Sequence, residues 1–489
     1  MKSCELTILD MVNVKFSGLD AVVRRRMNEA LKFMVPNARH TPQFKLKRWD
    51  GKVSFGTIGG ATYINMLDRV LPIVMEAGYD IEIIDKRPQF DFYLPQIDEN
   101  YLADRVWPVG HELAGLPIML RDYQVEAVNR YFSNQSSLQC LATGAGKTII
   151  TASLSLAVER ATGGRTIVIV PSKSLVEQTA EDYINVGLDT GLFYGDSKTY
   201  DSKHVIATWQ SLSVFDKNSK KYNLDMSFEE FMSDVKCVIV DECHMLKGKV
   251  LLDMLCGPMA NVPIRWGMTG TIPKEEYEFM ALLSSVGPVV GEIRAADLQA
   301  KEVLANCKIE IMELQDQHVE FNDYDAEHRF LTTDPDRLKW TADYCQKIAQ
   351  GDKGNILILV NKIATGKLLK DLIPDSVFIS GVVKTKDRKK EYDEVKTVDH
   401  KVIIATYGVA AVGISINRLF TAVLFEPGKS FVRCIQSCGR LLRRSKDKTD
   451  ALIIDLTSSL KYSKRHLAKR KEYYRDEKYP YTVTKVIYR

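Results

Sequence analysis

The chain has 489 residues, of which 45% are hydrophobic and 27% are charged, and its formal net charge is +4. This composition is typical of a globular protein of about three domains, and the net charge is too small to imply a nucleic-acid partner by itself. No apolar run reaches transmembrane length, no signal-peptide pattern opens the chain, and the nine scattered cysteines include no C-x-x-C pair. We therefore predict a cytoplasmic protein without a membrane association or a structural zinc site.

Residues 1–100 are predicted to form a small α+β domain. Their hydrophobic patterns predict strands at 5–8 and 79–84 and helices at 20–35 and 67–77. Between these, residues 44–58 alternate in hydropathy around Asp50-Gly51, a pair that is typical of a β-hairpin turn.

The predicted hairpin is basic and carries an aromatic residue. Lys47, Arg48 and Lys52 could meet phosphates, and Trp49 could stack on a base or act as a wedge. The alternative is that Trp49 belongs to the core and the charges are solvated, and the sequence leaves both interpretations open. A basic helix predicted from residue 461, ahead of a strand at 481–488, has the same two interpretations.

Two α/β domains of similar size are predicted to follow, at residues 101–295 and 296–489. Short apolar strands alternate with helices in both, which is typical of parallel sheets wrapped by helices. In the first domain the predicted strands are 138–142, 166–170, 205–208, 235–240 and 265–268. In the second domain they start near 309 and continue at 356–360, 376–379, 402–405, 422–425 and 451–455.

A glycine-rich loop between a strand and a helix, at residues 142–148, predicts a phosphate site. Its sequence is Ala-Thr-Gly-Ala-Gly-Lys-Thr, so the backbone N–H groups of Thr143, Gly144, Ala145 and Gly146 can surround a phosphate at a helix N-terminus. Lys147 can reach the β- and γ-phosphates of ATP, and the Thr148 hydroxyl can ligate Mg²⁺. Leu141 stands where the general pattern has its first glycine.

Further polar residues follow or precede the strands of the same domain. Asp241 and Glu242 come directly after an apolar strand, where a carboxylate can hold the Mg²⁺ of a nucleotide and a second can activate water as a general base. Gln124, beside Arg121, has an amide that can read the edges of adenine. Thr269 and Thr271 end another strand and could sense the phosphate state through their hydroxyls.

Taken in order, these motifs resemble superfamily 2 helicases of the DExH type. The resemblance covers Gln124 and residues 142–148, 170–173, 208–211, 241–244, 269–271, 356–361, 405–408, 413–415 and 436–444. It implies two tandem RecA-like motor domains that share one ATP, with a small α+β nucleic-acid-binding domain in front. It also implies nucleic-acid-stimulated hydrolysis of ATP with Mg²⁺.

The same resemblance implies roles for individual residues. Gln436 would position water, while Arg440 and Arg443 would contact the γ-phosphate, with Arg443 as the arginine finger. His244, Thr269 and Thr271 would couple hydrolysis to movement. The nucleic-acid backbone would be bound by Ser172, Lys173, Thr208, Gln210, Ser211, Thr406 and Gly408.

Arg48-Trp49-Asp50-Gly51-Lys52 within a small N-terminal domain is similar to the branch-recognition module of some repair helicases. The whole chain resembles the recombination and repair helicases of bacteriophages, which implies action in a host cytoplasm on branched DNA: Holliday junctions, stalled forks and R-loops. The resemblance also implies strand annealing, and a monomer and contacts with other recombination proteins are separate expectations that the sequence leaves open. An RNA or RNA–DNA helicase, and an annealing module with a decayed ATPase, remain as alternatives.

Overall fold

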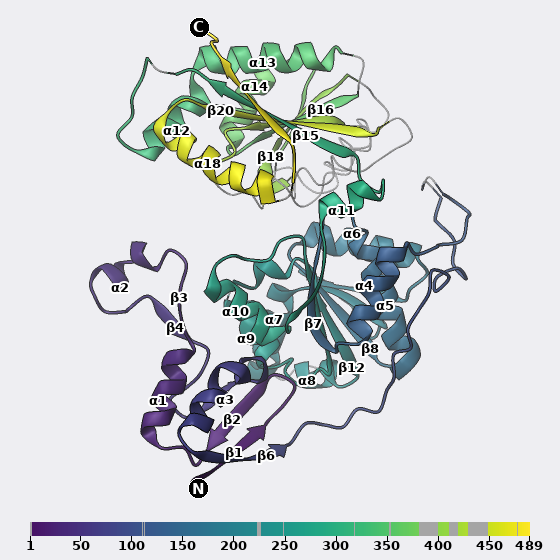
Figure 1. Ribbon diagram of the computed structural model, residues 1–489. Helices are drawn as coiled ribbons and strands as arrows, with labels where there is room; N and C mark the ends of the chain where they lie inside the picture. The colour runs from purple at the N-terminus through teal and green to yellow at the C-terminus, as the bar shows by residue number, and fades with distance from the viewer. Residues whose placement is uncertain are drawn as a thin grey trace. The chain divides into compact units, whose positions relative to one another are not determined.

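A computed structural model describes residues 2–109, 111, 113–222, 226–247, 249–316, 318–351, 354–380, 400–409, 419–428, 448–476 and 478–489. The chain divides into two compact units (Figure 1). Unit 1 comprises residues 1–141 and 146–292, and unit 2 comprises residues 142–145 and 293–489. Within the described residues, no helix combines the length and the apolar content needed to cross a membrane.

An N-terminal α+β module opens unit 1. Its four-stranded sheet has the order β5-β2-β1-β6, in which β1 pairs antiparallel with β2 and parallel with β6. The strands are β1 (Lys2–Ile8), β2 (Asn13–Ser17), β5 (Ala61–Tyr63) and β6 (Tyr79–Asp85), and the helices that pack on them are α1 (Ala21–Ala30) and α3 (Leu67–Glu76). Leu6, Phe16, Val23 and Val70 join the sheet and both helices in one core.

The prediction of a β-hairpin at residues 44–58 is wrong. The antiparallel pair is instead β3 (Lys32–Met34) with β4 (Lys52–Ser54), and the segment between them contains η1 (Ala38–His40) and a short helix, α2 (Pro42–Lys45). Thr41 caps α2 by accepting a hydrogen bond from the backbone of Phe44, and Pro42 occupies the first helical position. These two start signals outweigh the alternating pattern, and β3 also ends the predicted helix at 20–35 five residues early.

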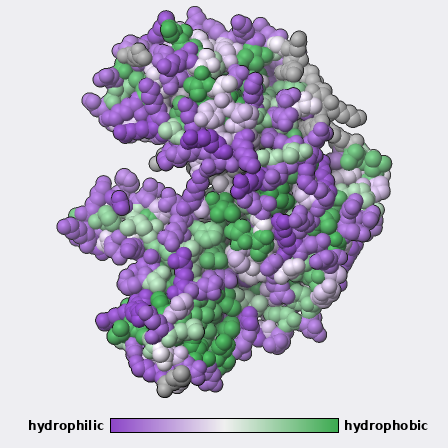
Figure 2. All heavy atoms as spheres, in the orientation of Figure 1, coloured by the Kyte–Doolittle hydropathy of each residue, from purple (hydrophilic) through white to green (hydrophobic). Residues whose placement is uncertain are grey.

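Residues 35–51, which we call the tip, therefore extend from a two-stranded stem. The cations Lys45, Lys47 and Arg48 are exposed there, and Leu46 is 62% exposed. Trp49 is half-buried and its indole N–H donates to the backbone oxygen of Lys52 at 2.8 Å, so it does not belong to the hydrophobic core. Figure 2 shows that the surface over α2 is mainly hydrophilic.

The first motor sheet has eight strands in the order β10-β9-β11-β8-β12-β13-β7-β14. They are β7 (Ser136–Leu141), β8 (Arg165–Val170), β9 (Thr190–Tyr194), β10 (Ser197–Lys198), β11 (His204–Thr208), β12 (Val235–Val240), β13 (Ile264–Thr269) and β14 (Val289–Ile293). The pairs from β9 to β7 are parallel, as the sequence predicts. All five predicted strands are present, and β9, β10 and β14 are additional.

Helices cover both faces of this sheet (Figure 1). One face carries α4 (Asp122–Phe132), α5 (Lys147–Thr162) and α6 (Lys173–Asn185). The other carries α7 (Trp209–Lys221), α8 (Phe228–Met232), α9 (Lys249–Cys256) and α10 (Glu276–Ser285). The buried apolar residues of β8, β11 and β12 pack against the second group in one core.

The N-terminal module is fastened to α9 and α10 of the first motor domain. Met280 and Ala281 of α10 are buried in the core of the module itself, and the rings of Phe55 and Tyr277 lie 5.5 Å apart. The side-chain amide of Asn13 donates to the backbone oxygen of Cys256 at 2.8 Å, and that of Asn65 donates to the oxygen of Leu283 at 2.9 Å. A shared core with polar contacts around it makes module and motor domain one body.

The second motor sheet has seven parallel strands in the order β17-β18-β16-β19-β20-β15-β21. They are β15 (Asn306–Leu314), β16 (Asn355–Val360), β17 (Val377–Ile379), β18 (Val402–Thr406), β19 (Leu419–Phe425), β20 (Asp450–Ser458) and β21 (Tyr481–Val486). On one face α13 (Pro335–Ala349) and α14 (Ile363–Leu372) share a core with the sheet, and α18 (Lys461–Asp476) covers the other face next to α12 (Tyr324–Thr333) (Figure 1). Every strand predicted for this domain is present.

Candidate nucleotide site and nucleic-acid surface

The carboxyl ends of β12, β13 and β7 bring the predicted nucleotide residues to one part of the first sheet. β12 and β13 are hydrogen-bonded neighbours, as are β13 and β7. Parallel strands end at the same edge, so Asp241 after β12, Thr269 at the end of β13 and the loop after β7 are one or two strand spacings of about 4.8 Å apart. Topology alone thus places motifs together that are more than 90 residues apart in sequence.

Lys147 and Glu242 form an ion pair at this edge. Lys147 is the first residue of α5, and its Nζ lies 2.8 Å from Oε1 of Glu242. Glu242 has a left-handed backbone, with φ 49°, and its N–H donates to Oδ1 of Asp241 at 2.8 Å. A non-glycine residue in this region is strained, and such strain is concentrated at functional sites.

Burial and charge separate the acidities of the two neighbouring carboxyl groups. Burial, reinforced by the charge of Glu242, raises the pKa of Asp241 to about 6. Burial also acts to raise the pKa of Glu242, but the charge of Lys147 and the hydrogen bond from His244 outweigh it and hold this pKa below its usual value. Two adjacent carboxyl groups with divergent pKa values are a common sign of an active site.

His244 links Glu242 to the end of β13. Its Nδ1 lies 3.2 Å from Oε2 of Glu242 and 2.9 Å from the hydroxyl oxygen of Thr269. The Thr269 hydroxyl also accepts the backbone N–H of Thr271 at 3.1 Å. The three predicted coupling residues therefore form one hydrogen-bonded chain that starts at Glu242.

The glycine-rich loop meets the predicted adenine reader, Gln124, at Gly146. Gly144 and Gly146 have φ values of 92° and 78°, which side-chain-bearing residues rarely adopt. A Cβ on Gly146 would lie 2.5 Å from Nε2 of Gln124, so this glycine also leaves room for the amide. The amide is oriented by the backbone N–H of Arg121, which donates to its Oε1 at 3.0 Å, while the rest of Arg121 is exposed.

The residues predicted to bind nucleic acid in unit 1 follow the neighbouring strands β8 and β11. Ser172 caps α6, Lys173 and Gln210 are exposed, and Thr208 is buried. The Thr208 hydroxyl donates to the Ser211 hydroxyl at 3.0 Å, and this in turn accepts the backbone N–H of Gly195 at 3.2 Å. The strand order puts this group beside the nucleotide residues but on a separate part of the edge.

In unit 2, Thr406 ends β18 and Gly408 follows it in an exposed position. Gln436, Arg440 and Arg443 lie outside the described residues, as do residues 413–415. The basic helix predicted from residue 461 is α18, and one of its arginines is buried and not exposed. Arg470 is 1% exposed and is bound by both carboxylate oxygens of Asp455, at 2.8 and 2.9 Å, so this residue anchors α18 to β20.

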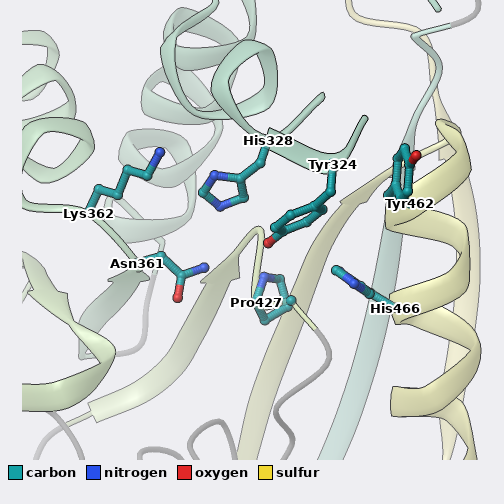
Figure 3. A pocket seen from close by; sticks show the side chains of 8 residues that line it. Tyr324, His328, Asn361, Lys362, Pro427, Tyr462 and His466 are labelled. Atoms are coloured by element: carbon teal, nitrogen blue, oxygen red, sulfur yellow. The ribbon is translucent and has the colours of Figure 1, made fainter. Parts of the chain in front are cut away.

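A pocket in unit 2 contains residues that sequence reasoning missed (Figure 3). It has a volume of about 550 Å³ and is lined by Tyr324, His328, Asn361, Lys362, Pro427, Gly428, Tyr462 and His466. Four of these residues form a repeated signal in the sequence, Tyr-x-x-x-His, at Tyr324–His328 on α12 and at Tyr462–His466 on α18. A spacing of four places each pair on one helix face, which could have marked them.

Comparison with known families defines the class of protein. Residues 117–274 match the family model of the type III restriction enzyme res subunit, and residues 340–445 match that of the helicase conserved C-terminal domain. Together with the relatives below, these matches show that the chain is an ATP-dependent helicase of superfamily 2 that acts on nucleic acid. The predicted enzyme class is confirmed.

The chain is similar to the ATP-dependent DNA helicase UvsW of Enterobacteria phage T4, with 24% identity over 94% of this chain and 95% of the relative. It is also 23% identical to the DNA 3'-5' translocase XPB2 of Sulfurisphaera tokodaii, over 74% of this chain and 86% of that protein. The structure of S. cerevisiae Dbp5 bound to RNA and ADP BeF3 is also similar, with a TM-score of 0.54 and 15% identity. The match covers 75% of this chain and 90% of the Dbp5 chain. That likeness confirms the predicted fold of tandem RecA-like domains.

Proposed function

We propose that this helicase uses ATP to unwind or migrate branched DNA in recombination and repair, including Holliday junctions, stalled forks and R-loops, and that it also anneals strands. The observation that carries this proposal is the basic tip on a module that shares a hydrophobic core with the first motor domain. A tip fixed to the motor can hold a DNA branch while the motor moves one strand past it. The similarity to UvsW, a DNA helicase, supports DNA as the substrate.

For the nucleotide, we propose that the loop at residues 142–148 and Lys147 bind the phosphates of ATP. Thr148 and Asp241 would hold Mg²⁺, because a hydroxyl and a carboxylate are the oxygen ligands this ion prefers. Glu242 would activate the attacking water as a general base, and Gln124 and Arg121 would contact the adenine ring of ATP. Gln436, Arg440 and Arg443 would contribute from the second motor domain, with Arg443 on the γ-phosphate.

The ion pair between Lys147 and Glu242 supports a defined order of events. ATP phosphates attract Lys147 more strongly than a single carboxylate does, so nucleotide binding would break the 2.8 Å pair. Glu242 then loses the cation that depresses its pKa and becomes a better base for the attacking water. Its remaining partner, His244, would pass the change to Thr269 and Thr271.

For the nucleic acid, we propose that Ser172, Lys173, Thr208, Gln210 and Ser211 bind the backbone of one strand together with Thr406 and Gly408. Short hydroxyl and amide side chains with backbone N–H groups suit phosphate contacts, which are independent of base sequence. At the tip, Lys47 and Arg48 would bind phosphates beside Trp49, together with Lys52 at the start of β4. We further propose three functional domains, 1–100, 101–295 and 296–489, a monomer working in the cytoplasm, and contacts with other recombination proteins.

A binding and unwinding panel tests the proposal. The full chain is assayed on a four-way junction, a fork, an R-loop, an RNA duplex and a plain DNA duplex of matched sequence, with and without ATP. We expect ATP-dependent unwinding of the branched substrates in preference to the plain duplexes. Equal or better activity on the RNA duplex would replace this proposal with an RNA helicase.

The triple variant Lys47→Ala, Arg48→Ala, Trp49→Ala tests the tip. It should weaken junction binding about tenfold and reduce the slope of log affinity against log salt by about two, one for each lost phosphate contact. Basal ATP hydrolysis should stay unchanged. The control variant Lys15→Ala, Arg25→Ala removes two exposed charges from the same module away from the tip. If both variants lost the same junction affinity, the tip would be a solvated surface without a specific role in binding.

A further inference from the structure

The pocket of unit 2 is built around one aromatic side chain. The Tyr324 ring lies 5.5 Å from the His328 ring, 6.1 Å from the Tyr462 ring and 5.2 Å from the His466 ring, measured between centroids. Figure 3 shows the Tyr324 ring between His328 on one side and the two α18 side chains on the other. Tyr324 is nevertheless 39% exposed, so part of its surface still faces the open pocket.

The chemistry of this lining suits a planar, unstacked ring. Aromatic faces stack on bases without regard to sequence, and the Asn361 and tyrosine side chains offer polar groups for a ring edge. Burial and the nearby charge of Lys362 lower the pKa of His328, so its imidazole is neutral near pH 7. A volume of about 550 Å³ lies within the usual range for small-molecule sites.

Cationic groups stand beside the aromatic ones. Lys362 lines the pocket, and Lys461 and Arg465 lie over the Tyr462 ring, with their charged atoms 5.6 and 5.8 Å from its centroid. Glu327 accepts hydrogen bonds from the backbone N–H groups of Tyr462 and Ser463, at the start of α18, at 3.0 and 2.8 Å. The rim of the pocket can therefore receive an anion next to the stacked ring.

The pocket lies next to the strand ends already proposed to bind nucleic acid. Val360 and Thr406 are register partners on β16 and β18, and Asn361 and Lys362 follow Val360 directly. The next strands along the sheet, β19 and β20, lead to Pro427 and, after a short turn, to Tyr462. A DNA strand held at Thr406 and Gly408 that ran across the sheet edge would thus meet the pocket at Asn361 and Lys362, after the next strand of the sheet.

We propose that this pocket binds one unstacked nucleotide of a DNA single strand, with the base against Tyr324 and the adjacent phosphate at Lys362. The proposal deepens the proposed function and rests on it. A base can enter only when it is unpaired, so the pocket would favour the separated strand over the duplex and help prevent it from reannealing. Continuity with Thr406 favours a strand over a free nucleotide, which shares the same ring and phosphate chemistry.

The test compares an intact single strand with strands that lack one base. Fluorescence anisotropy is measured with the full chain on a thymidine oligonucleotide and on a series in which an abasic site moves along it. For the wild type we expect one position at which the abasic site weakens binding about tenfold. Tyr324→Ala should weaken binding of the intact strand by a similar factor and abolish the positional effect, whereas Tyr324→Phe should retain both.

Lys362→Ala should weaken binding of intact and abasic strands alike, and its matched control, Lys347→Ala on the exposed face of α13, should not. The wild type could bind the strand and show strand-stimulated ATP hydrolysis but no positional effect of the abasic site. That result would overturn the proposal for the pocket and leave the proposed function standing. A wild type that binds no strand would overturn both. Thymidine monophosphate could compete for the pocket in the wild type and lose this competition in Tyr324→Ala, while strand binding stays unchanged. That result would mean that the pocket binds a free nucleotide and not a nucleotide of a DNA strand.

Discussion

The two motor sheets have the same parallel architecture but very different carboxyl edges. The first edge carries Lys147, Asp241, Glu242 and His244 in a connected set of ionisable groups, whereas the second carries an aromatic pocket around Tyr324. The sheets supply a similar scaffold in both cases, and the side chains on the loops and helices beside the strand ends determine the chemistry. A shared fold therefore predicts where a site lies and not what it does.

Charged pairs show the same contrast. Lys147 and Glu242 keep 12% and 19% of their side-chain surface exposed, so an incoming ligand can reach the pair. In the second motor domain, Arg337 and Asp316 are fully buried at 2.7 Å, and Arg337 also binds Glu426. An accessible pair can exchange partners during a reaction, but a buried pair cannot without unfolding. We expect the first to serve activity and the second to serve stability.

Replacement of Lys147 should have the largest effect on activity. Lys147→Ala should reduce nucleic-acid-stimulated ATP hydrolysis about 10³-fold, because a preorganised cation at the phosphates is lost. The free energy of unfolding should change by less than the ~3–5 kcal/mol expected for a fully buried pair, since the two side chains keep 12% and 19% of their surface exposed. A phosphate-release assay with a parallel denaturation curve measures both. Lys217→Ala, an exposed lysine of α7, is the control and should change neither quantity.

Replacement of Glu242 should separate binding from hydrolysis. Glu242→Gln should retain ATP binding and lower turnover about 10²-fold, because the amide cannot take a proton from water. Equilibrium binding of a fluorescent ATP analogue and single-turnover hydrolysis check the two halves of this expectation. The matched change Glu229→Gln on the surface of α8 should be silent. Wild-type turnover in Glu242→Gln would remove this residue from the role of base.

Replacement of Arg337 should show the opposite pattern. Arg337→Met leaves Asp316 and Glu426 buried without their cation, which should cost about 3–5 kcal/mol of unfolding free energy. Urea denaturation measures this cost, with Arg329→Ala on the exposed side of α12 as the control. Basal hydrolysis by the fraction that remains folded should be close to that of the wild type. A stable but inactive Arg337→Met would contradict the division between the two pairs.

The smallest expected effect distinguishes two tyrosines of unit 2. The Tyr474 hydroxyl is buried and donates to Asp455 at 2.7 Å, so Tyr474→Phe should destabilise the protein by about 1.5 kcal/mol. Tyr324→Phe, in the open pocket, should leave the unfolding free energy unchanged. Differential scanning calorimetry compares both variants with the wild type. Equal shifts in the two variants would mean that Tyr324 is a structural residue.

The sequence predicted most of the fold because strand ends in α/β domains coincide with sharp changes from apolar to polar residues. The run Cys237–Val240 followed by Asp241 marks the end of a strand, and the structure has that strand end at the expected place. The tip was mispredicted because alternation at residues 44–58 competed with local capping at Thr41, and a pattern of period two cannot register such a cap.

The pocket around Tyr324 could not be predicted from single motifs. Its lining comes from α12, α18 and the loops after β16 and β19, and residues that are more than 130 positions apart meet only after the sheet has formed. Arg470 shows the converse limit. A basic helix predicts a solvated surface, yet a buried carboxylate on β20 recruits one of its arginines into the interior, and only tertiary contacts reveal that choice.

The central claim is that nucleic acid drives ATP hydrolysis at the edge that holds Lys147 and Glu242. Steady-state hydrolysis by the full chain, measured with no nucleic acid, with a DNA single strand and with a four-way junction, tests it most directly. The account predicts a clear stimulation by both DNAs that Lys147→Ala abolishes. Hydrolysis that is equal with and without each DNA, or a stimulated rate that survives in Lys147→Ala, would contradict it.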